Sequence, residues 1–223
     1  MSNFPLKIVG AGTHGKFIFV ILEKEYSLWS TLGMTGNWST EKTKHTRLTL
    51  KLDDGEIYFN DQRNFGTIKL VRGKYQLIEK LQSFGPDLLT QDTSDDEFIN
   101  CLRKKDKWPI CKTLMDQSVV AGVGNYIKSD CLWLSRISPH AKVQDISNER
   151  LVVLKNAITQ IMKESLRMGG ASMQNYMSFE GKKGLYTQKF LAYSRDCDND
   201  GNKLIREKTP DGRTTYWCPE IQF

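Results

Sequence analysis

The spacing of the apolar residues changes along this 223-residue chain, and that change limits the possible folds more than any other feature. Between Lys16 and Lys74, short runs such as FIFVILE, RLTLKL and EIYFN alternate apolar and polar residues. The turn signal Asp53-Asp54-Gly55 separates two of these runs. A period of two residues with tight turns between the runs is typical of antiparallel strands. The sequence therefore predicts an N-terminal β domain.

A helical period replaces this alternation from about Asp95 to Met168. Its last helix is expected to bury one face, formed by Leu151, Leu154, Ile158 and Ile161. Ser147 is expected to cap the start of this helix and Gly169 to end it. The final forty or so residues return to strand signals, with Asp211-Gly212 as the tip of a hairpin between KLIREKT and TTYWC. The predicted fold class is α+β.

Composition restricts the function. The chain has 32 Lys and Arg against 26 Asp and Glu, a formal net charge of +6, which favours a polyanionic partner. It has no apolar segment of the roughly 18 residues that can span a bilayer, and its start, MSNFPLKIVG, lacks the pattern of a signal peptide. Its 5 cysteines are odd in number and irregularly spaced, so we expect no structural disulfide. We expect an intracellular protein, nuclear or cytoplasmic and not secreted.

A glycine pair interrupts the helical region in the stretch LMDQSVVAGVGNYIKSDCLW. Gly122 and Gly124 allow a tight turn, after which the next helix presents free backbone N–H groups, an arrangement that suits an anion. Polar residues near the turn in sequence are Lys112, Asn125, Lys128 and Arg136. The alternative is a helix–turn–helix packed only for stability.

Several further segments occur in a characteristic order along the chain: LGMTGNW, KHTRLTLKLDDGEIYFNDQRNFG, FGPDLL and GRTTYWCP. Together with the glycine turn they resemble the Fpg/Nei (formamidopyrimidine-DNA glycosylase / endonuclease VIII) family, and most of all its eukaryotic endonuclease VIII-like branch. The resemblance implies a base-excision repair enzyme, a DNA glycosylase and AP lyase that removes oxidised bases and nicks the strand. Its partner would be damaged DNA, and we expect a monomer.

The resemblance also implies three domains. Residues 1–85 would form an antiparallel β-sandwich that is incomplete at its N-terminal side. Residues 86–185 would form the helix-two-turn-helix DNA-binding domain, with a domain boundary near Gly85. Residues 186–223 would form a β-hairpin that corresponds to the family's zinc finger in a degenerate state.

Particular residues match the family's site. Base removal requires the target nucleotide to leave the stack, and the matching void-filling residues are Met34, Arg63 and Phe65. Composition alone would favour ordinary core packing for Met34 and Phe65. The implied DNA contacts are Lys16, Arg47, Arg63, Lys112, Asn125, Lys128 and Arg213. Of these, Lys16 and Arg213 are implied to be catalytic, aiding β-elimination and δ-elimination respectively.

The family's N-terminal Pro-Glu pair has no counterpart in this sequence. Pro5 is no substitute, because its nitrogen is acylated and no glutamate adjoins it. Two interpretations are left open: a truncated record of a longer enzyme, or a catalytically inactive homologue that binds damaged DNA. On either interpretation we expect the 223 residues alone to lack base excision.

The zinc finger is the second departure from the family. Of four expected ligands only Cys197 and Cys218 remain, and Ile221 stands where the last cysteine belongs. Carboxylates that could complete a site are Asp198, Asp200 and Glu220. We nevertheless expect a finger without metal or other cofactor, held by packing of Phe190, Tyr216 and Trp217.

Two matters stay open at the level of sequence. A basic RNA-binding or ribosome-associated protein would also explain the charge and the glycine turn, although not the other segments. The lesion is not specified, because the implied lesion-capping loop, GGASMQNYMSFEGKKG at residues 169–184, matches only loosely.

Overall fold

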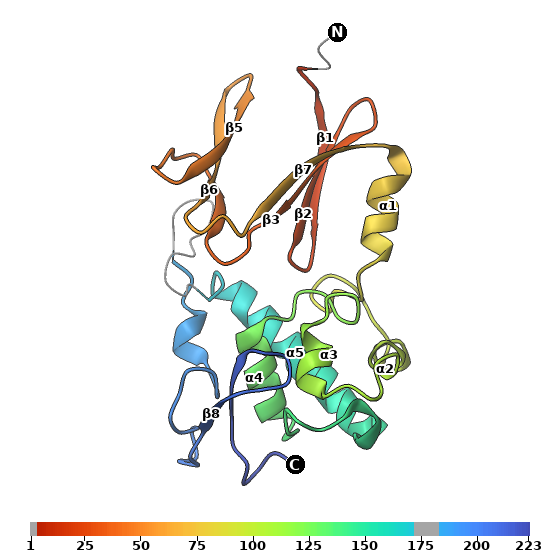
Figure 1. Cartoon of the computed structure of the whole chain (residues 1–223), viewed down its shortest axis with the longest axis vertical. Coiled ribbons are helices and arrows are strands. Elements are labelled where there is room, and N and C mark those ends of the chain that lie inside the picture. Colours follow the sequence, from red (N-terminus) through yellow and green to blue (C-terminus); the bar gives the residue numbers. More distant parts are fainter. Residues whose placement is uncertain (1–3, 172–182) are drawn as a thin grey trace. The chain divides into compact units, whose positions relative to one another are not determined.

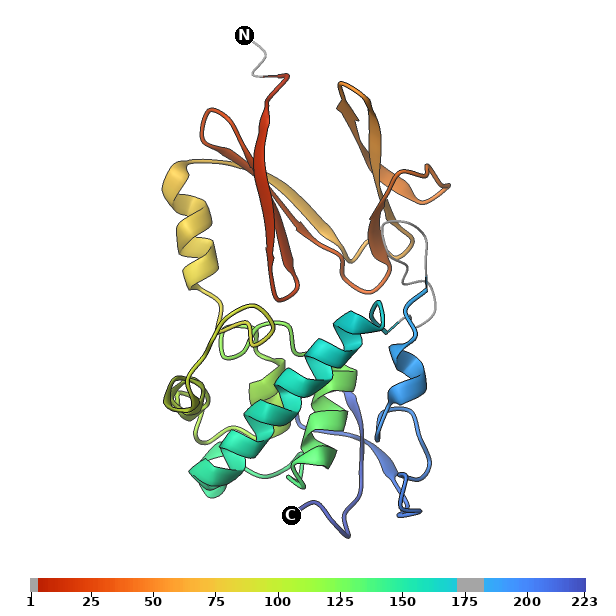
Figure 2. The same ribbon diagram turned by 180° about the vertical axis from the view of Figure 1, so that it is seen from behind.

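The computed structural model describes residues 4–171 and 183–223. The chain forms two compact units, each built from two segments, which can be followed in Figures 1 and 2. The first unit comprises Met1–Gln82 and Met168–Thr187, and the second comprises Ser83–Arg167 and Gln188–Phe223. Most of the implied capping loop, residues 172–182, lies outside the described residues.

This division differs from the three predicted domains in two respects. The boundary after Gln82 lies close to the predicted one at Gly85, but the C-terminal hairpin is not a domain of its own. It packs on a helix of the second unit, as described below. The segment around Leu185 joins the first unit, where Leu185 N donates to Met168 O at 2.9 Å and Leu185 pairs with Ala171.

The first unit contains two antiparallel sheets, as the alternating pattern predicts. The four-stranded sheet has the order β1-β2-β3-β7, with β1 Ile8–His14, β2 Phe17–Leu22, β3 Tyr26–Thr31 and β7 Thr67–Arg72. The three-stranded sheet has the order β4-β6-β5, with β4 Gly36–Ser39, β5 Thr46–Leu52 and β6 Gly55–Asp61. Trp38 of β4 links the two sheets, because its Nε1 donates to Ser30 Oγ on β3 at 3.1 Å. Within its own sheet Trp38 packs on Phe59 of β6, with ring centroids 5.1 Å apart.

Two elements of this unit were not predicted. Strand β1 has the sequence IVGAGTH, in which Gly10 and Gly12 interrupt the apolar alternation. Gly12 is needed because a Cβ there would lie 2.6 Å from the ring of Phe19 on β2. Helix α1, Lys74–Gln82, was also missed, since its sequence has no capping signal and no fully buried residue.

The second unit is helical, as predicted, with α2 Asp95–Arg103, α3 Ile110–Met115, α4 Asn125–Leu134 and α5 Asn148–Arg167. The predicted buried face of α5 is confirmed: Leu151, Leu154, Ile158 and Ile161 are at most 2% exposed. The start of α2 is capped by Ser94, whose Oγ accepts from Glu97 N at 3.1 Å. No helix in the described ranges is both long and apolar enough to cross a bilayer.

The C-terminal hairpin pairs β8, Ile205–Lys208, with β9, Thr214–Trp217. The predicted tip at Asp211-Gly212 is confirmed, and Gly212 has a φ of 75°, which favours glycine. Because each strand has only four residues, the hairpin depends on the helices beside it for its position.

Candidate nucleic-acid interface

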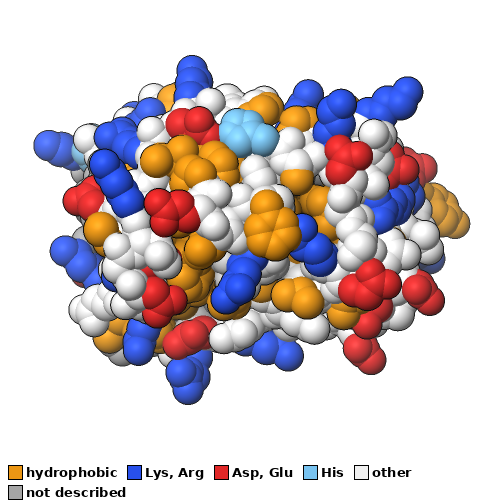
Figure 3. All heavy atoms as spheres, turned by 90° about the horizontal axis from the view of Figure 1, so that it is seen from below, with side chains coloured by type: hydrophobic (Ala, Val, Ile, Leu, Met, Phe, Trp, Pro, Cys, Tyr) orange, Lys and Arg blue, Asp and Glu red, His pale blue; other side chains and the backbone are white. Residues whose placement is uncertain are grey.

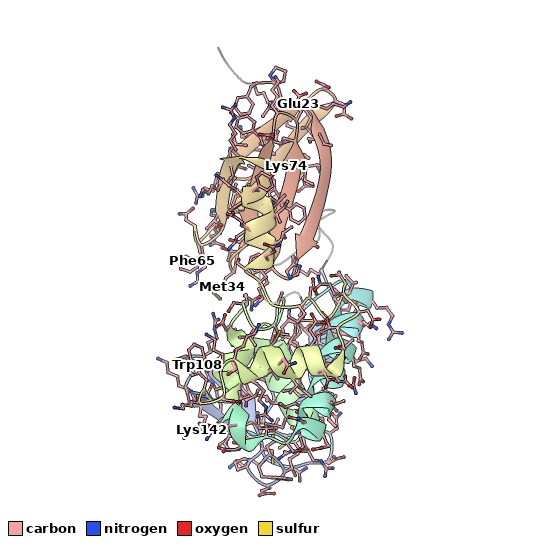
Figure 4. The ribbon with its side chains drawn as sticks, turned by 90° about the vertical axis from the view of Figure 1, so that its right-hand side faces the viewer. Glu23, Met34, Phe65, Lys74, Trp108 and Lys142 are labelled. Carbon is pink, nitrogen blue, oxygen red and sulfur yellow. The ribbon has the colours of Figure 1, made fainter. Side chains whose placement is uncertain are left out.

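The three predicted void-filling residues come together on the surface of the first unit. Met34 is 59% exposed and Phe65 is 55% exposed, although both are large and apolar. The guanidinium of Arg63 lies 4.7 Å from the ring centroid of Phe65, and its Nη1 is 3.5 Å from Met34 Sδ. Figure 4 shows Met34 and Phe65 close together at the surface. Core packing, the alternative for these residues, therefore does not describe them.

A buried carboxylate fixes the conformation of the loop that carries Arg63 and Phe65. Asp61, at the end of β6, is 1% exposed. Its Oδ1 accepts from Thr35 Oγ1 at 2.6 Å and from Arg63 N at 3.2 Å, while its Oδ2 accepts from Gly66 N at 2.8 Å. Burial alone would raise the pKa of the Asp61 carboxyl, but these hydrogen bonds hold the pKa below its usual value.

The loops that carry Met34 and Phe65 also lie close together, and glycines at the contact make this possible. Gly33 has a φ of 59°, and a Cβ at this position would lie 2.7 Å from the carbonyl carbon of Phe65. A Cβ at Gly66 would lie 2.9 Å from Thr31 O. Only glycine permits such close backbone approach, so the sequence holds the two exposed side chains in one fixed cluster.

The predicted cations of the first unit are exposed. Lys16 is the second residue of the two-residue turn that joins β1 to β2, in which Gly15 has a φ of 56°. Arg47 lies on β5, and its Nε donates to Asp61 O at 2.9 Å. Arg47 thus also fastens the loop that begins at Asp61.

In the second unit the glycine turn is closed by a side chain. Gln117 Oε1 accepts from Gly122 N at 3.0 Å, and Gln117 Nε2 donates to Val123 O at 3.1 Å. Helix α4 then begins at Asn125, after Gly124, with no side-chain cap. Asn125 Nδ2 donates to Thr214 O of the hairpin at 2.8 Å, and among the described residues its buried Oδ1 has no hydrogen-bond partner. The side-chain amide of Asn125 is predicted to bind a phosphate. One of its N–H donors is therefore already used within the protein.

The prediction that Lys128 contacts DNA is corrected by the structure. Lys128 is 0% exposed, and its Nζ lies 2.6 Å from Asp211 Oδ2 at the hairpin tip. It stands three residues after Asn125, on the face of α4 that packs against the hairpin. Its ammonium is therefore enclosed by protein and not available to a phosphate.

Arg136 is also not part of the turn. It follows the C-terminal end of α4, a ten-residue helix about 15 Å long, and so lies at the opposite end from Gly124. Lys112 and Arg213, by contrast, are exposed, and their contact with DNA stays a prediction. Lys112 Nζ lies 4.1 Å from the ring centroid of Trp108, which Lys105 Nζ also approaches at 4.3 Å. Figure 4 shows Trp108 at the surface of this unit.

The surface of the protein is not basic on every face. On the face in Figure 3, Lys and Arg side chains are mixed with Asp and Glu and with apolar groups. A mixed surface of this kind does not produce the single-sign field that attracts a polyanion. The exposed cations named above are better candidates.

The hairpin region does not fit a zinc site. In the described part of the chain, no group of three or more His, Cys, Asp or Glu is placed to hold a metal ion. Cys218 is fully buried in an apolar cluster with Ala192 and Leu204. Asp198 Oδ1 instead accepts from Asp200 N at 3.0 Å and from Asn202 N at 2.8 Å. Whether the finger is free of metal stays a prediction.

Aromatic packing links the predicted finger residues. Phe190 lies 5.1 Å from Tyr193 between ring centroids, and Tyr193 lies 5.4 Å from Tyr216. Trp217 Nε1 donates to Glu207 Oε1 at 2.8 Å. The sequence reasoning missed Tyr193, which connects the other two rings.

A second buried carboxylate, also missed, joins α4 to the segment that precedes β8. Asp130 is 0% exposed, and it accepts backbone hydrogen bonds from Leu191 N at 3.2 Å, Ala192 N at 2.9 Å and Tyr193 N at 2.8 Å. Nothing in the sequence around either carboxylate marks it as buried.

Known proteins resemble this chain over nearly its whole length. Residues 6–68 match the formamidopyrimidine-DNA glycosylase N-terminal domain, and residues 84–177 match the formamidopyrimidine-DNA glycosylase H2TH domain. The proteins named formamidopyrimidine-DNA glycosylase from Desulfitobacterium hafniense and Thermus thermophilus are each 32% identical to the chain. Each match covers 97% of the chain and 82% of the relative.

Solved structures agree with these matches. The crystal structure of the MutM (Fpg) protein from Thermus thermophilus superimposes with a TM-score of 0.87 at 30% identity, covering 97% of this chain and 83% of that one. A Lactococcus lactis Fpg mutant in complex with a Fapy-dG containing DNA gives a TM-score of 0.85 at 28% identity, covering 97% and 82%.

Proposed function

Since this chain belongs to the formamidopyrimidine-DNA glycosylase family, we propose that it acts in base-excision repair as a DNA glycosylase and AP lyase. Its substrate is damaged DNA, from which it removes an oxidised base and then nicks the strand. The observation that carries the proposal is the match of both family domains, in order, over most of the chain. Family membership argues against the alternative of an RNA-binding protein.

The exposed cluster of Met34, Arg63 and Phe65 supports a mechanism for opening the duplex. When a nucleotide leaves the stack, a void of about one base remains, and unstacking costs a few kcal/mol. Met34 and Phe65 would fill the void with a thioether and a ring, and Arg63 would donate to the unpaired base. Because the loops are fixed by Asp61 and Gly33, little ordering entropy is lost when DNA binds.

Side chains of each unit would contact phosphates of the DNA. The proposed contacts are Lys16, Arg47, Lys112, Asn125 and Arg213, of which Lys16 and Arg213 would also serve the elimination steps. An arginine suits the hairpin tip because its planar fork binds a phosphate through two N–H groups and stays charged. Placement of the protein in the endonuclease VIII-like branch stays a prediction, since the relatives named above carry the formamidopyrimidine-DNA glycosylase name.

The double variant Met34→Ala/Phe65→Ala tests the void-filling role. Wild-type protein is expected to bind a duplex with a tetrahydrofuran abasic analogue more tightly than an undamaged duplex, because an unpaired site opens more easily. The variant should lose about tenfold or more in affinity for the abasic duplex while keeping its affinity for the undamaged one. Fluorescence anisotropy with both duplexes measures this.

The matched control is Leu70→Ala on β7, which removes an apolar side chain of the same unit that is 41% exposed. It should bind both duplexes as the wild type does. Equal losses on both duplexes for the double variant would contradict the void-filling role.

We also propose that the hairpin corresponds to the family's zinc finger and works without metal. Elemental analysis of the purified protein should find well under one zinc per chain, and a chelator should leave the thermal midpoint unchanged, because no metal contributes to folding. Stoichiometric zinc would contradict this and would direct attention to the carboxylates near Cys197.

A further inference from the structure

The ion pair between Lys128 and Asp211 is enclosed by the second unit. The side chain of Lys128 is 0% exposed, that of Asp211 is 2% exposed, and Nζ lies 2.6 Å from Oδ2. Lysine is almost never fully buried unless it is paired, and desolvation of such a pair offsets much of its attraction. A pair of this kind is a weak source of stability, so its location is more informative than its energy.

The pair joins helix α4 to the tip of the hairpin. Asp211 Oδ1, the oxygen that does not face Lys128, accepts from Thr209 Oγ1 at 2.5 Å and from Arg213 N at 3.4 Å. Thr209 N in turn donates to Arg213 O at 3.0 Å. Both backbone polar groups of Arg213 are therefore bound within a turn that Lys128 anchors to the helix.

A second contact anchors the residue after Arg213. Asn125 Nδ2 donates to Thr214 O at 2.8 Å, and Asn125 lies one helical turn before Lys128. Helix α4 thus holds the hairpin on both sides of Arg213, through the side chain of Asp211 and the carbonyl of Thr214, while the side chain of Arg213 is left exposed.

Charge explains why the anchor is an ion pair. Burial is the main reason that the pKa of Lys128 lies below its usual value, and the nearby Arg213 guanidinium lowers that pKa further, whereas Asp211 opposes both effects. Asp211 neutralises the buried ammonium, so the free positive charge of the hairpin tip belongs to Arg213.

We propose that Lys128 is a positioning residue that, through Asp211, fixes the hairpin tip so that Arg213 presents its guanidinium to a DNA phosphate. This inference rests on the proposed function, in which Arg213 is a phosphate contact. Lys128 itself touches no DNA.

The test is the salt dependence of binding to the abasic duplex. Each phosphate contact contributes about 0.9 to the slope of log K against log salt. Arg213→Ala should lower the slope by about this amount, with an affinity loss of about tenfold. Lys128→Met/Asp211→Asn, which replaces the charges by neutral groups of similar size, should reproduce both changes.

Combining the three substitutions separates positioning from direct contact. If Lys128 acts through Arg213, the triple variant should bind as Arg213→Ala does. The control is Lys155→Met/Asp95→Asn, which removes an ion pair of 2.8 Å between α5 and α2 in the same unit, and it should bind as the wild type does. Circular dichroism and thermal unfolding establish that each variant is folded.

Four outcomes would overturn the inference. A folded Lys128→Met/Asp211→Asn variant with the wild-type slope shows that the pair does not position Arg213. A triple variant with a slope well below that of Arg213→Ala shows that Lys128 binds a phosphate itself. Wild-type protein that binds no DNA, or an Arg213→Ala slope equal to that of the wild type, overturns the proposed function and this inference together.

If the Lys128→Met/Asp211→Asn variant does not fold, Thr209→Val tests the inference by the same measurement, the slope of log K against log salt. It keeps the ion pair and removes the hydroxyl that contacts Asp211 Oδ1, Arg213 O and Thr215 Oγ1, so it loosens the tip without changing its charge. A lowered slope supports the inference, and an unchanged slope overturns it.

Discussion

Asp61→Ala is expected to destabilise the first unit by about 2 to 4 kcal/mol, because the substitution leaves buried donors without an acceptor. The hydroxyl of Thr35 and the backbone N–H groups of Arg63 and Gly66 all bind the Asp61 carboxylate. The loop from Asp61 to Gly66 should lose its fixed conformation even where the sheets persist. Hydrogen exchange should show faster exchange in this loop, and the preference for the abasic duplex should be lost.

The matched control is Glu79→Ala, an exposed carboxylate on α1 of the same unit, for which we expect less than about 0.5 kcal/mol. Because the pKa of Asp61 is lowered in the folded protein, its contribution is present above the unfolded pKa of about 3.9 and is lost as pH falls through the folded pKa. The gap in stability between wild type and Asp61→Ala should therefore narrow below about pH 4. A gap that is constant between pH 7 and pH 3 would contradict the role given to the carboxylate.

The periodic elements could be predicted from sequence because burial leaves a pattern there. The alternation in RLTLKL and EIYFN gives β5 and β6, and the spacing of Leu151, Leu154 and Ile158 gives the buried face of α5. The pattern fails in β1, where Gly10 and Gly12 contribute no apolar signal. Gly12 makes room for the Phe19 ring of the neighbouring strand.

The candidate site was only partly predictable. Met34, Arg63 and Phe65 were found through family resemblance, since the residue types of Met34 and Phe65 alone indicate core packing. Lys128 was assigned wrongly because the sequence shows that it lies one turn from Asn125 but not that the hairpin covers that face. A buried, paired lysine and an exposed, phosphate-binding one have the same appearance in a sequence.

Asp130 illustrates the same limit, and it supports the last prediction. Its carboxylate is 0% exposed and accepts hydrogen bonds from the successive backbone N–H groups of Leu191, Ala192 and Tyr193. These contacts bind the segment before β8 to α4, at the apolar cluster of Ala192, Leu204 and Cys218. Asp130 thus fixes the start of the segment whose end is held by Asn125 and Lys128.

Asp130→Ala is expected to cost about 3 to 5 kcal/mol, because it leaves three backbone donors without their acceptor in a closed interior. Asp130→Asn should cost less, since its remaining oxygen can still accept from Ala192 and Tyr193 while its NH2 faces the Leu191 donor. Denaturant unfolding of both variants measures which one loses more stability. The control is Asp145→Ala, which removes an exposed carboxylate of the same unit. Hydrogen exchange should rise in residues 190–218 before it rises in α5. If Asp130→Ala unfolds at the wild-type denaturant concentration, the carboxylate does not anchor the hairpin region, and the packing of Phe190, Tyr193 and Tyr216 must hold it instead.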